Sequence, residues 1–560
     1  MSSKSVKNEK YIYALLILIT AFCLYVKARY GICEDEEFFV SLIYRISKDI
    51  NNTIVFKVWD SYQLTGTIFS PFVCLYHNIF NNYDYLYLIL RLLAISLLVL
   101  ATIYFYNFCR KELSISKGLS FVLSIIYLLS VPKLGYNIDN SLQLMIYYTI
   151  FSCELYKYIK KRRVVNLIIS ALFYCFSILA YVTVLFSFPV LILLLCAIIN
   201  NKKDKLKSIL LFSVSCLILG IIFLLIFINF KSITYDDLIY NISQIVEGES
   251  VNFNVLKKLA YDIKRYFLSF AIFYLPLFIV DCIFYKNIEL KDRINKTFVN
   301  VYTLINVVVI VLTFTEIIKI SIFTLMVRLI PLSIILITKI GKDKFNIINF
   351  LYIVLLIICY TSTDQYIDTQ ARYIFTSILL SFGYIYKEVK YIKKKYYVYI
   401  SFIVSLVFAI YSTGIYVPID MNSNSNIFAK FVTTDIAPFQ GLYLDEDRKA
   451  DYEDLHNFNI KDEPLTIVSG YMRGCWYVVN ENDPITPFTE TGYLPEYKWV
   501  NYFEHNNINK GILLVHTKYY KTIDDFAKHF VFGEYILNNY NIKVVKRGSR
   551  FVEYEYEKAR

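Results

Sequence analysis

The stretch GICEDEEFFVSLIYRI, residues 31–46, places four acids in a row, from Glu34 to Glu37. It follows an apolar run, Tyr11 to Val26, that is long enough to form a transmembrane helix. Acids at a membrane surface, at the start of a long polar loop, are placed to act on a substrate held in the lipid. The alternative is that these acids only form the solvated beginning of a helix.

The composition of the chain indicates a membrane protein. It has 560 residues, of which 57% are hydrophobic and 19% are charged, and its mean hydropathy is +0.48. A soluble protein of this length carries more charge and less apolar surface. Apolar runs of about 20 residues recur between clusters of Lys and Arg, so we predict a polytopic α-helical membrane protein.

The net charge of +12 is unevenly distributed along the chain. The basic excess lies in residues 1–417, whereas residues 418–560 contain more acids than bases. The basic residues cluster between the apolar runs, which is typical of loops on the cytoplasmic side of a membrane. These clusters therefore indicate which loops face the cytoplasm. We expect membrane lipids, and no nucleic acid, as partners of this region.

The apolar runs predict about thirteen transmembrane helices, with the N-terminus inside and the C-terminus outside the cell membrane. The first external loop is residues 29–83, and a transmembrane domain covers residues 1–417. The predicted spans are 11–28, 84–107, 115–131, 142–157, 164–181, 184–200, 208–229, 266–285, 298–314, 318–338, 346–361, 372–386 and 397–417.

Two regions outside the membrane carry further predictions. In the first loop, Phe39–Ile46 and Ser70–Ile79 are apolar enough to form helices on the membrane surface. Residues 418–560 form a predicted extracytoplasmic α/β domain. Its expected strands are Leu465–Ser469, Gly511–His516 and one or two within Lys543–Tyr556, and its expected helix is Asp524–Asn539.

Asp35 and Glu36 are the candidate catalytic acids. A sugar hydroxyl is a poor nucleophile, and a positioned carboxylate can take its proton during attack on an activated sugar carbon. A neighbouring acid can tune that group or help to hold a metal ion. In the alternative interpretation, Asp35 caps a helix that begins at Phe38, and Glu36 and Glu37 are favoured by the helix dipole.

The order of features after these acids resembles the start of GT-C glycosyltransferases. The likeness covers residues 31–46 and the segment GTIFSPFVCLYHNIFNNYDYLYLILRLLAISLLVL, residues 66–100. It is strongest to the branch that contains dolichyl-phosphate-mannose protein mannosyltransferases and the lipid A aminoarabinose transferase. Those chains have one span, an external loop that opens with Asp-Glu, a surface helix, a proline-containing helix, and a second span with an Arg near its outer end. Asp35-Glu36 and Arg91 fall on these positions.

The resemblance implies roles for further residues. Asp139 would be a second acid or a metal ligand, unless it only caps the following span. Arg372 and Tyr373 match an Arg-Tyr pair that enters a late span of such enzymes and would hold the donor phosphate. Arg328 sits inside a span, where charge is costly and suggests function, although it could pair with Glu316. The other candidates are Arg91 for the phosphate, and His77 and Trp59 for substrate contact.

Family members often have a basic or aromatic pair in the loop before the second span. In this chain His77 is the only candidate for that pair, so its contact with substrate is open. The alternative is a histidine that simply lies at the membrane interface.

The implied activity is transfer of a hexosyl or pentosyl group from a polyprenyl-phosphate donor to a cell-surface glycan, lipid or protein. The reaction would take place on the extracytoplasmic face of the cytoplasmic membrane. No motif requires a cofactor, and a divalent metal, Mg²⁺ or Mn²⁺, is left open. The alternatives are a flippase for lipid-linked oligosaccharides, a polysaccharide polymerase or ligase, and a catalytically inactive glycan-binding protein.

Overall fold

The computed structural model describes most of the N-terminal half of the chain and much of the C-terminal region. The described residues are 3–48, 63–129, 136–231, 275–284, 409–411, 413–418, 424–458, 466–468, 475–481 and 507–559, with isolated positions within 260–297, 403–407 and 500–504. The four predicted spans between 298 and 386 lie outside these residues. Those at 266–285 and 397–417 are described only in part.

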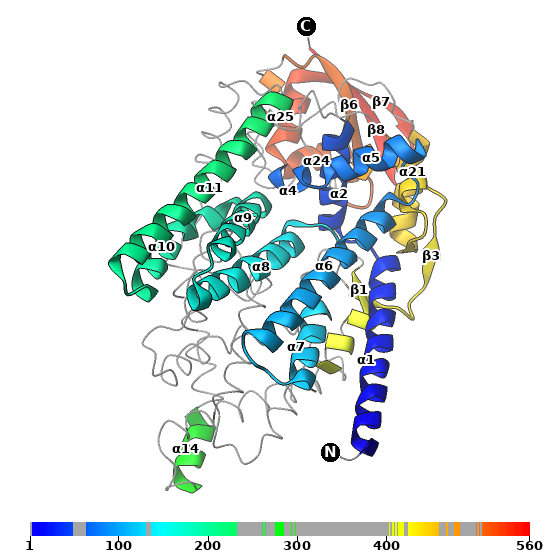
Figure 1. The fold of residues 1–560 in the computed structure, drawn as a ribbon. Helices are drawn as coiled ribbons and strands as arrows, with labels where there is room; N and C mark the ends of the chain where they lie inside the picture. The colour runs from blue at the N-terminus through cyan, green and yellow to red at the C-terminus, as the bar shows by residue number, and fades with distance from the viewer. Residues whose placement is uncertain are drawn as a thin grey trace.

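The N-terminal part is a bundle of helices that lie side by side (Figure 1). Three of the described helices contain segments long and apolar enough to cross a membrane, within Lys10–Arg29, Leu86–Lys111 and Lys202–Phe223. The bundle helices are α1 (Ser3–Arg29), α6 (Leu86–Lys111), α7 (Lys117–Leu129), α8 (Asn140–Lys161), α9 (Val164–Ala180), α10 (Phe188–Ile198) and α11 (Lys202–Lys231), with α14 (Leu275–Phe284) apart from them.

The seven predicted spans up to residue 229 each coincide with one of these helices. The sixth span begins differently, because the chain first makes a 3₁₀ turn, η2 (Val182–Ser187), and the α-helix starts at Phe188. Pro189 explains this start, since proline lacks an N–H and clashes with a preceding helical turn but fits the first turn of a helix.

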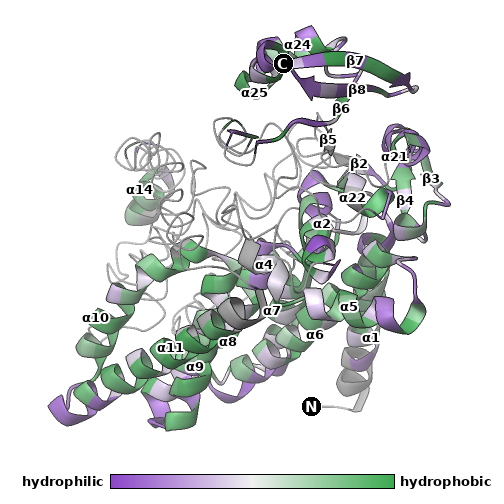
Figure 2. Cartoon of the chain, turned by 90° about the horizontal axis from the view of Figure 1, so that it is seen from above, coloured by the Kyte–Doolittle hydropathy of each residue, from purple (hydrophilic) through white to green (hydrophobic). Residues whose placement is uncertain are grey.

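The ribbon of the bundle helices is largely green, the colour of hydrophobic residues, in Figure 2, and many of their large apolar side chains are exposed. Leu18 in α1 is 68% exposed and Leu217 in α11 is 62% exposed. Water would make such a surface costly, whereas lipid tails are as apolar as these side chains. The exposed apolar faces therefore fit the predicted membrane location.

Three short helices lie at one end of α6: α2 (Glu34–Lys48), α4 (Gln63–Thr67) and α5 (Ser70–Phe80). Helix α5 has Pro71 in its first turn and ends at Asn81, which has the left-handed φ of 53°. The helix predicted over Ser70–Ile79 is therefore confirmed. Leu75, Ile79 and Phe80 are exposed, as expected for a helix on a membrane surface.

The prediction for α2 was partly wrong. The helix begins at Glu34 rather than at Phe38, so all four acids lie in its first turn. Almost every side chain of α2 is buried, because the helix packs against α4, α5 and the C-terminal helix α22 (Cys475–Val479). An amphipathic sequence fits a surface helix, but here a later part of the chain covers the face that was expected to contact water.

The C-terminal part contains a four-stranded sheet in the order β5-β6-β8-β7, in which only the β5–β6 pair is parallel. The predicted strands at 465–469 and 511–516 correspond to β5 and β6. The elements are β1 (Tyr416–Pro418), β2 (Asn424–Asn426), β3 (Phe431–Thr433), η5 (Ala437–Phe439), β4 (Tyr443–Asp445), α21 (Glu446–Phe458), β5 (Thr466–Val468), β6 (Lys510–His516), α24 (Ile523–His529), α25 (Val531–Asn539), β7 (Tyr540–Arg547) and β8 (Phe551–Lys558).

The single helix predicted over Asp524–Asn539 is two helices that meet at Phe530, whose backbone is extended. The second helix folds back closely on the first. A Cβ atom at Gly533 would lie 2.7 Å from the Cα atom of Ala527. Glycine at position 533 therefore permits α25 to pack closely against α24.

The segment from η5 to β4 is attached to the outer ends of α1 and α6 by backbone hydrogen bonds. The Gly31 N–H donates to the Tyr443 carbonyl at 2.9 Å, and the Tyr85 N–H donates to the Ala437 carbonyl at 2.8 Å. The buried apolar core is continuous across this junction, and it includes Phe439 as well as the bundle. The domain boundary at 417/418 stays a prediction.

Gly441 provides a test of this junction. Its φ is +82°, and an added Cβ atom would lie 2.8 Å from Leu88 Cδ2 in α6. We expect Gly441→Ala to lower the free energy of unfolding by about 1–3 kcal/mol, because it adds both backbone strain and a clash. Thermal unfolding in detergent, followed by a thiol-reactive dye on buried cysteines such as Cys109 and Cys475, would measure the change.

The matched control is Gly220→Ala in α11, where nothing lies within 4 Å of the added atom. This change is expected to be neutral or stabilising by up to about 1 kcal/mol, since alanine favours a helix. Equal melting temperatures for native protein and Gly441→Ala would contradict the close approach described here.

Candidate active site

The site is built on the first turn of α2. The Cys33 carbonyl accepts the N–H groups of Glu36 at 3.0 Å and Glu37 at 3.1 Å, so the helix starts directly after Cys33. Acids are favoured in a first turn because the N–H groups of a helix start carry partial positive charge. The expectation that this turn is solvated is nevertheless wrong, because Glu34, Glu36 and Glu37 are buried.

Glu36 forms a buried ion pair with Arg91, which extends from the second turn of α6. The guanidinium binds both carboxylate oxygens, with Nε–Oε1 and Nη2–Oε2 distances of 2.6 Å each. Its remaining N–H groups donate to the carbonyl oxygens of Gly31 at 2.6 Å, Ala28 at 3.3 Å and Lys27 at 3.5 Å.

All five N–H groups of Arg91 therefore have acceptors within the protein. The resemblance implied that Arg91 binds the donor phosphate, and the geometry does not fit that role. Arg91 instead joins the outer ends of α1, α2 and α6. Glu36, which was expected to support Asp35, is the acid that Arg91 holds.

Glu34 and Glu37 are paired with the C-terminal helix α21. Arg448 approaches Glu34 Oε1 with Nη2 at 3.3 Å and Glu37 Oε1 with Nη1 at 3.6 Å. The Tyr452 hydroxyl donates to Glu37 Oε1. Burial raises the pKa of Glu37, although the charge of Arg448 and the hydrogen bond from Tyr452 act in the opposite direction.

Asp35 is the member of the acidic row that is not buried. Its side chain is partly exposed, whereas its three neighbours are enclosed and compensated by arginines. The structure thus distinguishes one partly exposed carboxylate, Asp35, from three buried ones.

Asp139 lies beside this turn and caps α8. Its Oδ1 accepts the N–H of Leu142 at 2.7 Å, and its side chain is 1% exposed. Asp139 therefore caps α8, and its role as a second acid stays a prediction. The loop before α8 contacts the loop before α2, since Asn137 Nδ2 lies 4.0 Å from Cys33 Sγ. The starts of α2 and α8 consequently lie close together.

His77 belongs to an aromatic cluster at the other end of α2. Its ring stacks on Tyr83 with centroids 4.4 Å apart, and Lys48 Nζ lies 5.4 Å from the centre of the Tyr83 ring. Asp35 and Lys48 are near opposite ends of α2, about 20 Å apart along the helix. The structure does not bring His77 to the acidic turn. Trp59, Arg328, Arg372 and Tyr373 lie outside the described residues.

The comparisons with known proteins identify the fold. No protein-family model matches the chain, and no curated protein matches its sequence. Among solved structures, the chain is similar to ArnT, an aminoarabinose transferase, from Cupriavidus metallidurans bound to undecaprenyl phosphate. The similarity covers 98% of each chain with a TM-score of 0.52 and 11% sequence identity.

This chain has the GT-C fold. A second similar structure is the oligosaccharyltransferase from Archaeoglobus fulgidus in complex with Zn and sulfate, at 13% identity and a TM-score of 0.49. The similarity covers 97% of this chain and 73% of that one. The likeness to ArnT alone, over 98% of the chain, supports the fold that the resemblance beginning at residue 31 implied.

Within the described part of the chain, no three side chains of His, Cys, Asp or Glu come together in an arrangement that could hold a metal ion. Asp139 is engaged with the backbone of α8. The described residues offer no ligand set for the divalent metal, Mg²⁺ or Mn²⁺, that the sequence left open, and we derive no step through a metal.

Sequence reasoning missed Arg448 and Tyr452, because more than 400 positions separate them from the acids they bind. The sequence feature that could have pointed to such distant partners was the row of acids itself. Four consecutive acids next to a membrane span need cations if they are buried, and the first external loop has too few.

The division between scaffold and site can be tested through stability. Glu36→Gln removes the charge that compensates buried Arg91, so we expect it to lower the free energy of unfolding by about 3–5 kcal/mol. Asp35→Asn changes a partly exposed side chain and should leave the melting temperature nearly unchanged. Thermal unfolding in detergent measures both. A loss of stability in Asp35→Asn as large as that in Glu36→Gln would place Asp35 in the scaffold.

The raised pKa of Glu37 predicts a pH dependence of stability. The folded state favours the protonated form, so this contribution to stability is present below the ordinary pKa of 4.5 and is lost as pH rises through the raised pKa. Glu37→Gln keeps a neutral side chain at every pH. We therefore expect the stability of native protein relative to Glu37→Gln to fall from acidic to neutral pH.

Unfolding temperatures measured across this pH range would test the expectation. The groups that act on Glu37 are Arg448, Tyr452, Asp451 and Glu36. Glu453→Gln, on the exposed face of α21, serves as the control and should track native protein at all pH values. A constant difference between native protein and Glu37→Gln would contradict the raised pKa.

Proposed function

We propose that this chain is an integral-membrane glycosyltransferase that takes a sugar from a polyprenyl-phosphate carrier. The acceptor is a hydroxyl group on a cell-surface glycan, lipid or protein at the extracytoplasmic face of the cytoplasmic membrane. The observation that carries the proposal is the position of Asp35, a partly exposed carboxylate in the first turn of α2. It is held there by three buried neighbours in a chain with the GT-C fold.

Asp35 is the general base in this proposal. The acceptor oxygen attacks the anomeric carbon, the bond between that carbon and the phosphate oxygen breaks, and the hydroxyl proton passes to Asp35. Polyprenyl phosphate leaves with the bonding electrons. A single displacement of this kind inverts the configuration of the sugar.

The buried pairs reduce the repulsion between Asp35 and the three other acids. Like charges nearby disfavour ionisation, and opposite charges favour it. Arg91 offsets Glu36, and Arg448 offsets Glu34 and Glu37. The N-terminal end of α2 adds favourable partial charge, so Asp35 does not face three uncompensated neighbours.

The donor is proposed from two considerations. ArnT, which shares the fold, was solved with undecaprenyl phosphate, and apolar outer faces such as that of α11 fit a carrier in the lipid. The departing phosphate needs cations. Arg372 and Arg328, with Tyr373 beside Arg372, remain the proposed phosphate site, and the donors of Arg91 are occupied by Glu36 and backbone carbonyls.

Turnover of the purified chain in nanodiscs tests the proposal. Polyprenyl-phosphate sugars and a panel of acceptors are offered, and release of polyprenyl phosphate is followed. We expect Asp35→Asn to lower the rate by about 10²–10⁴-fold, the contribution of a general base. Asp435→Asn, an exposed aspartate near η5, is the control and should retain the native rate.

Two results would contradict this assignment. Release that is equal in native protein and in Asp35→Asn would remove Asp35 from the chemistry while keeping the transferase. No release by native protein from any donor and acceptor combination would count against the transferase and favour transport of a lipid-linked sugar, which needs no accessible base.

A further inference from the structure

Helix α21 carries two stripes of side chains that contact different parts of the molecule. Arg448, Tyr452 and Leu455 follow each other at helical spacing and form one buried stripe. This stripe includes both residues that hold the acids of α2. Tyr452 also stacks on Phe439, with ring centroids 4.2 Å apart, and Phe439 stacks on Tyr87 of α6 at 4.4 Å.

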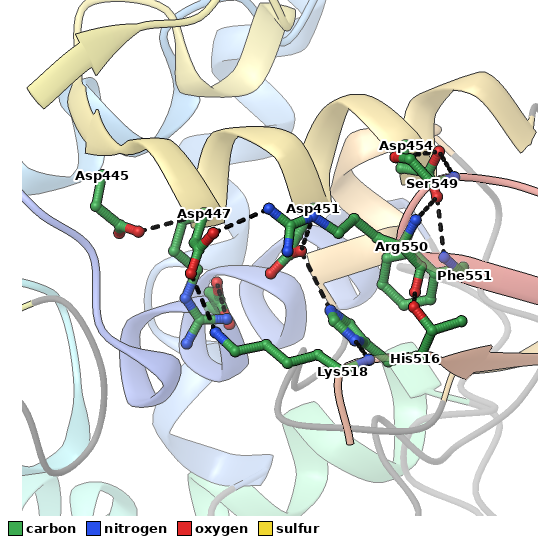
Figure 3. Close-up of polar contacts among 12 residues, drawn as sticks. Asp445, Asp447, Asp451, Asp454, His516, Lys518, Ser549, Arg550 and Phe551 are labelled. Carbon is green, nitrogen blue, oxygen red and sulfur yellow. Dashed lines mark hydrogen bonds and ion pairs between the residues drawn. The ribbon is translucent and has the colours of Figure 1, made fainter. Parts of the chain in front are cut away.

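The second stripe consists of Asp447, Asp451 and Asp454. Each of these acids immediately precedes a residue of the first stripe in the sequence. Figure 3 shows these acids facing side chains at the ends of the sheet strands. Asp447 pairs with Arg550 at 2.9 Å and with Lys518 at 3.2 Å, and Asp451 lies 3.2 Å from His516 Nε2.

Asp454 is the strongest attachment between α21 and the sheet. Its two oxygens accept the N–H groups of Ser549 at 3.0 Å, Arg550 at 2.9 Å and Phe551 at 3.0 Å, and also the Ser549 hydroxyl at 3.1 Å. A Cβ atom at Gly548 would lie 2.4 Å from Asp454, so glycine allows the β7–β8 turn to close on the carboxylate. These charge-assisted bonds fix α21 to the start of β8.

We propose that α21 is a strut through which the C-terminal sheet sets the position of the acidic turn of α2. Arg448 and Tyr452 are positioning residues, and Asp454 anchors the strut at its other side. The inference rests on the proposed function, in which the acidic turn carries the general base. It gives the C-terminal region a part in the transfer reaction, in addition to its packing against the bundle.

The position of α21 is coupled directly to that of the acidic turn of α2. Arg448 and Tyr452 contact Glu34 and Glu37, which flank Asp35 in the same helical turn. Buried ions tolerate little separation from their partners, because an unpaired buried charge costs several kcal/mol. A displacement of α21 must therefore either move the acidic turn or break these pairs. A shift of about 1 Å in a catalytic group can cost about 10²-fold in rate.

The test uses the full chain in nanodiscs and two independent readouts. The first is hydrogen–deuterium exchange of the backbone in α2, Glu34–Lys48. The second is polyprenyl phosphate release, separated into kcat and the KM for the donor. The variants are Asp454→Asn, which has no contact with α2, Tyr452→Phe, which removes only a hydroxyl, and Arg448→Met. Glu453→Gln, on the exposed face of α21, is the control.

We expect faster exchange in the first turns of α2 for the three variants. The expected kinetic effect is a loss of about tenfold or more in kcat with little change in the donor KM. Because Arg448→Met leaves two buried acids without their arginine, adding Glu34→Gln and Glu37→Gln should restore the exchange protection of α2. A general loss of folding would accelerate exchange throughout the chain and would not be rescued in this way.

Unchanged exchange in α2 of folded Asp454→Asn and Tyr452→Phe would overturn the inference. So would equal acceleration in α2 and in a bundle helix farther from it such as α11, which packs on α9 and α10. If the native chain releases no polyprenyl phosphate, the proposed function fails, and the exchange measurement still decides whether the sheet and the acidic turn are coupled.

Discussion

The compensation of three buried acids in the first turn of α2 is the constraint on which the rest of the structure depends. Burying a carboxylate costs several kcal/mol unless a cation and further hydrogen bonds accompany it. Arg91 satisfies this requirement for Glu36, and Arg448 satisfies it for Glu34 and Glu37. One arginine comes from α6 and the other from α21, so this single turn holds the bundle and the C-terminal region together.

The same arrangement separates the accessible acid from the structural ones. A solvated row of four acids would repel one another and fluctuate, and no member would be distinguished. Once three of them are enclosed and paired, Asp35 is presented at a fixed place beside the starts of α2 and α8. A general base needs this kind of fixed placement, since misalignment by about 1 Å lowers rates steeply. Stability and proposed catalysis thus draw on the same charges.

The fold was predictable where local rules act. Seven helices followed from apolar length, and α5 followed from its proline and apolar residues. Long-range partners were not predictable in this way. The sequence placed Arg91 near the outer end of its span, but only the packed structure showed that Glu36 and three carbonyl groups use its donors. The early start of α2 and its burial also depend on segments beyond residue 435, which pack against this helix.

The amino-acid order alone was sufficient for the membrane character, the order of the first seven helices, the C-terminal strands and the acidic row with its resemblance to GT-C enzymes. Each of these depends on hydrophobic periodicity or on neighbours in the chain. The partners of the three buried acids, Glu34, Glu36 and Glu37, were decided by contacts with α6 and α21. Pairing of buried charges depends on distance in space, and residues such as Glu37 and Tyr452 carry no local pattern that would bring them together.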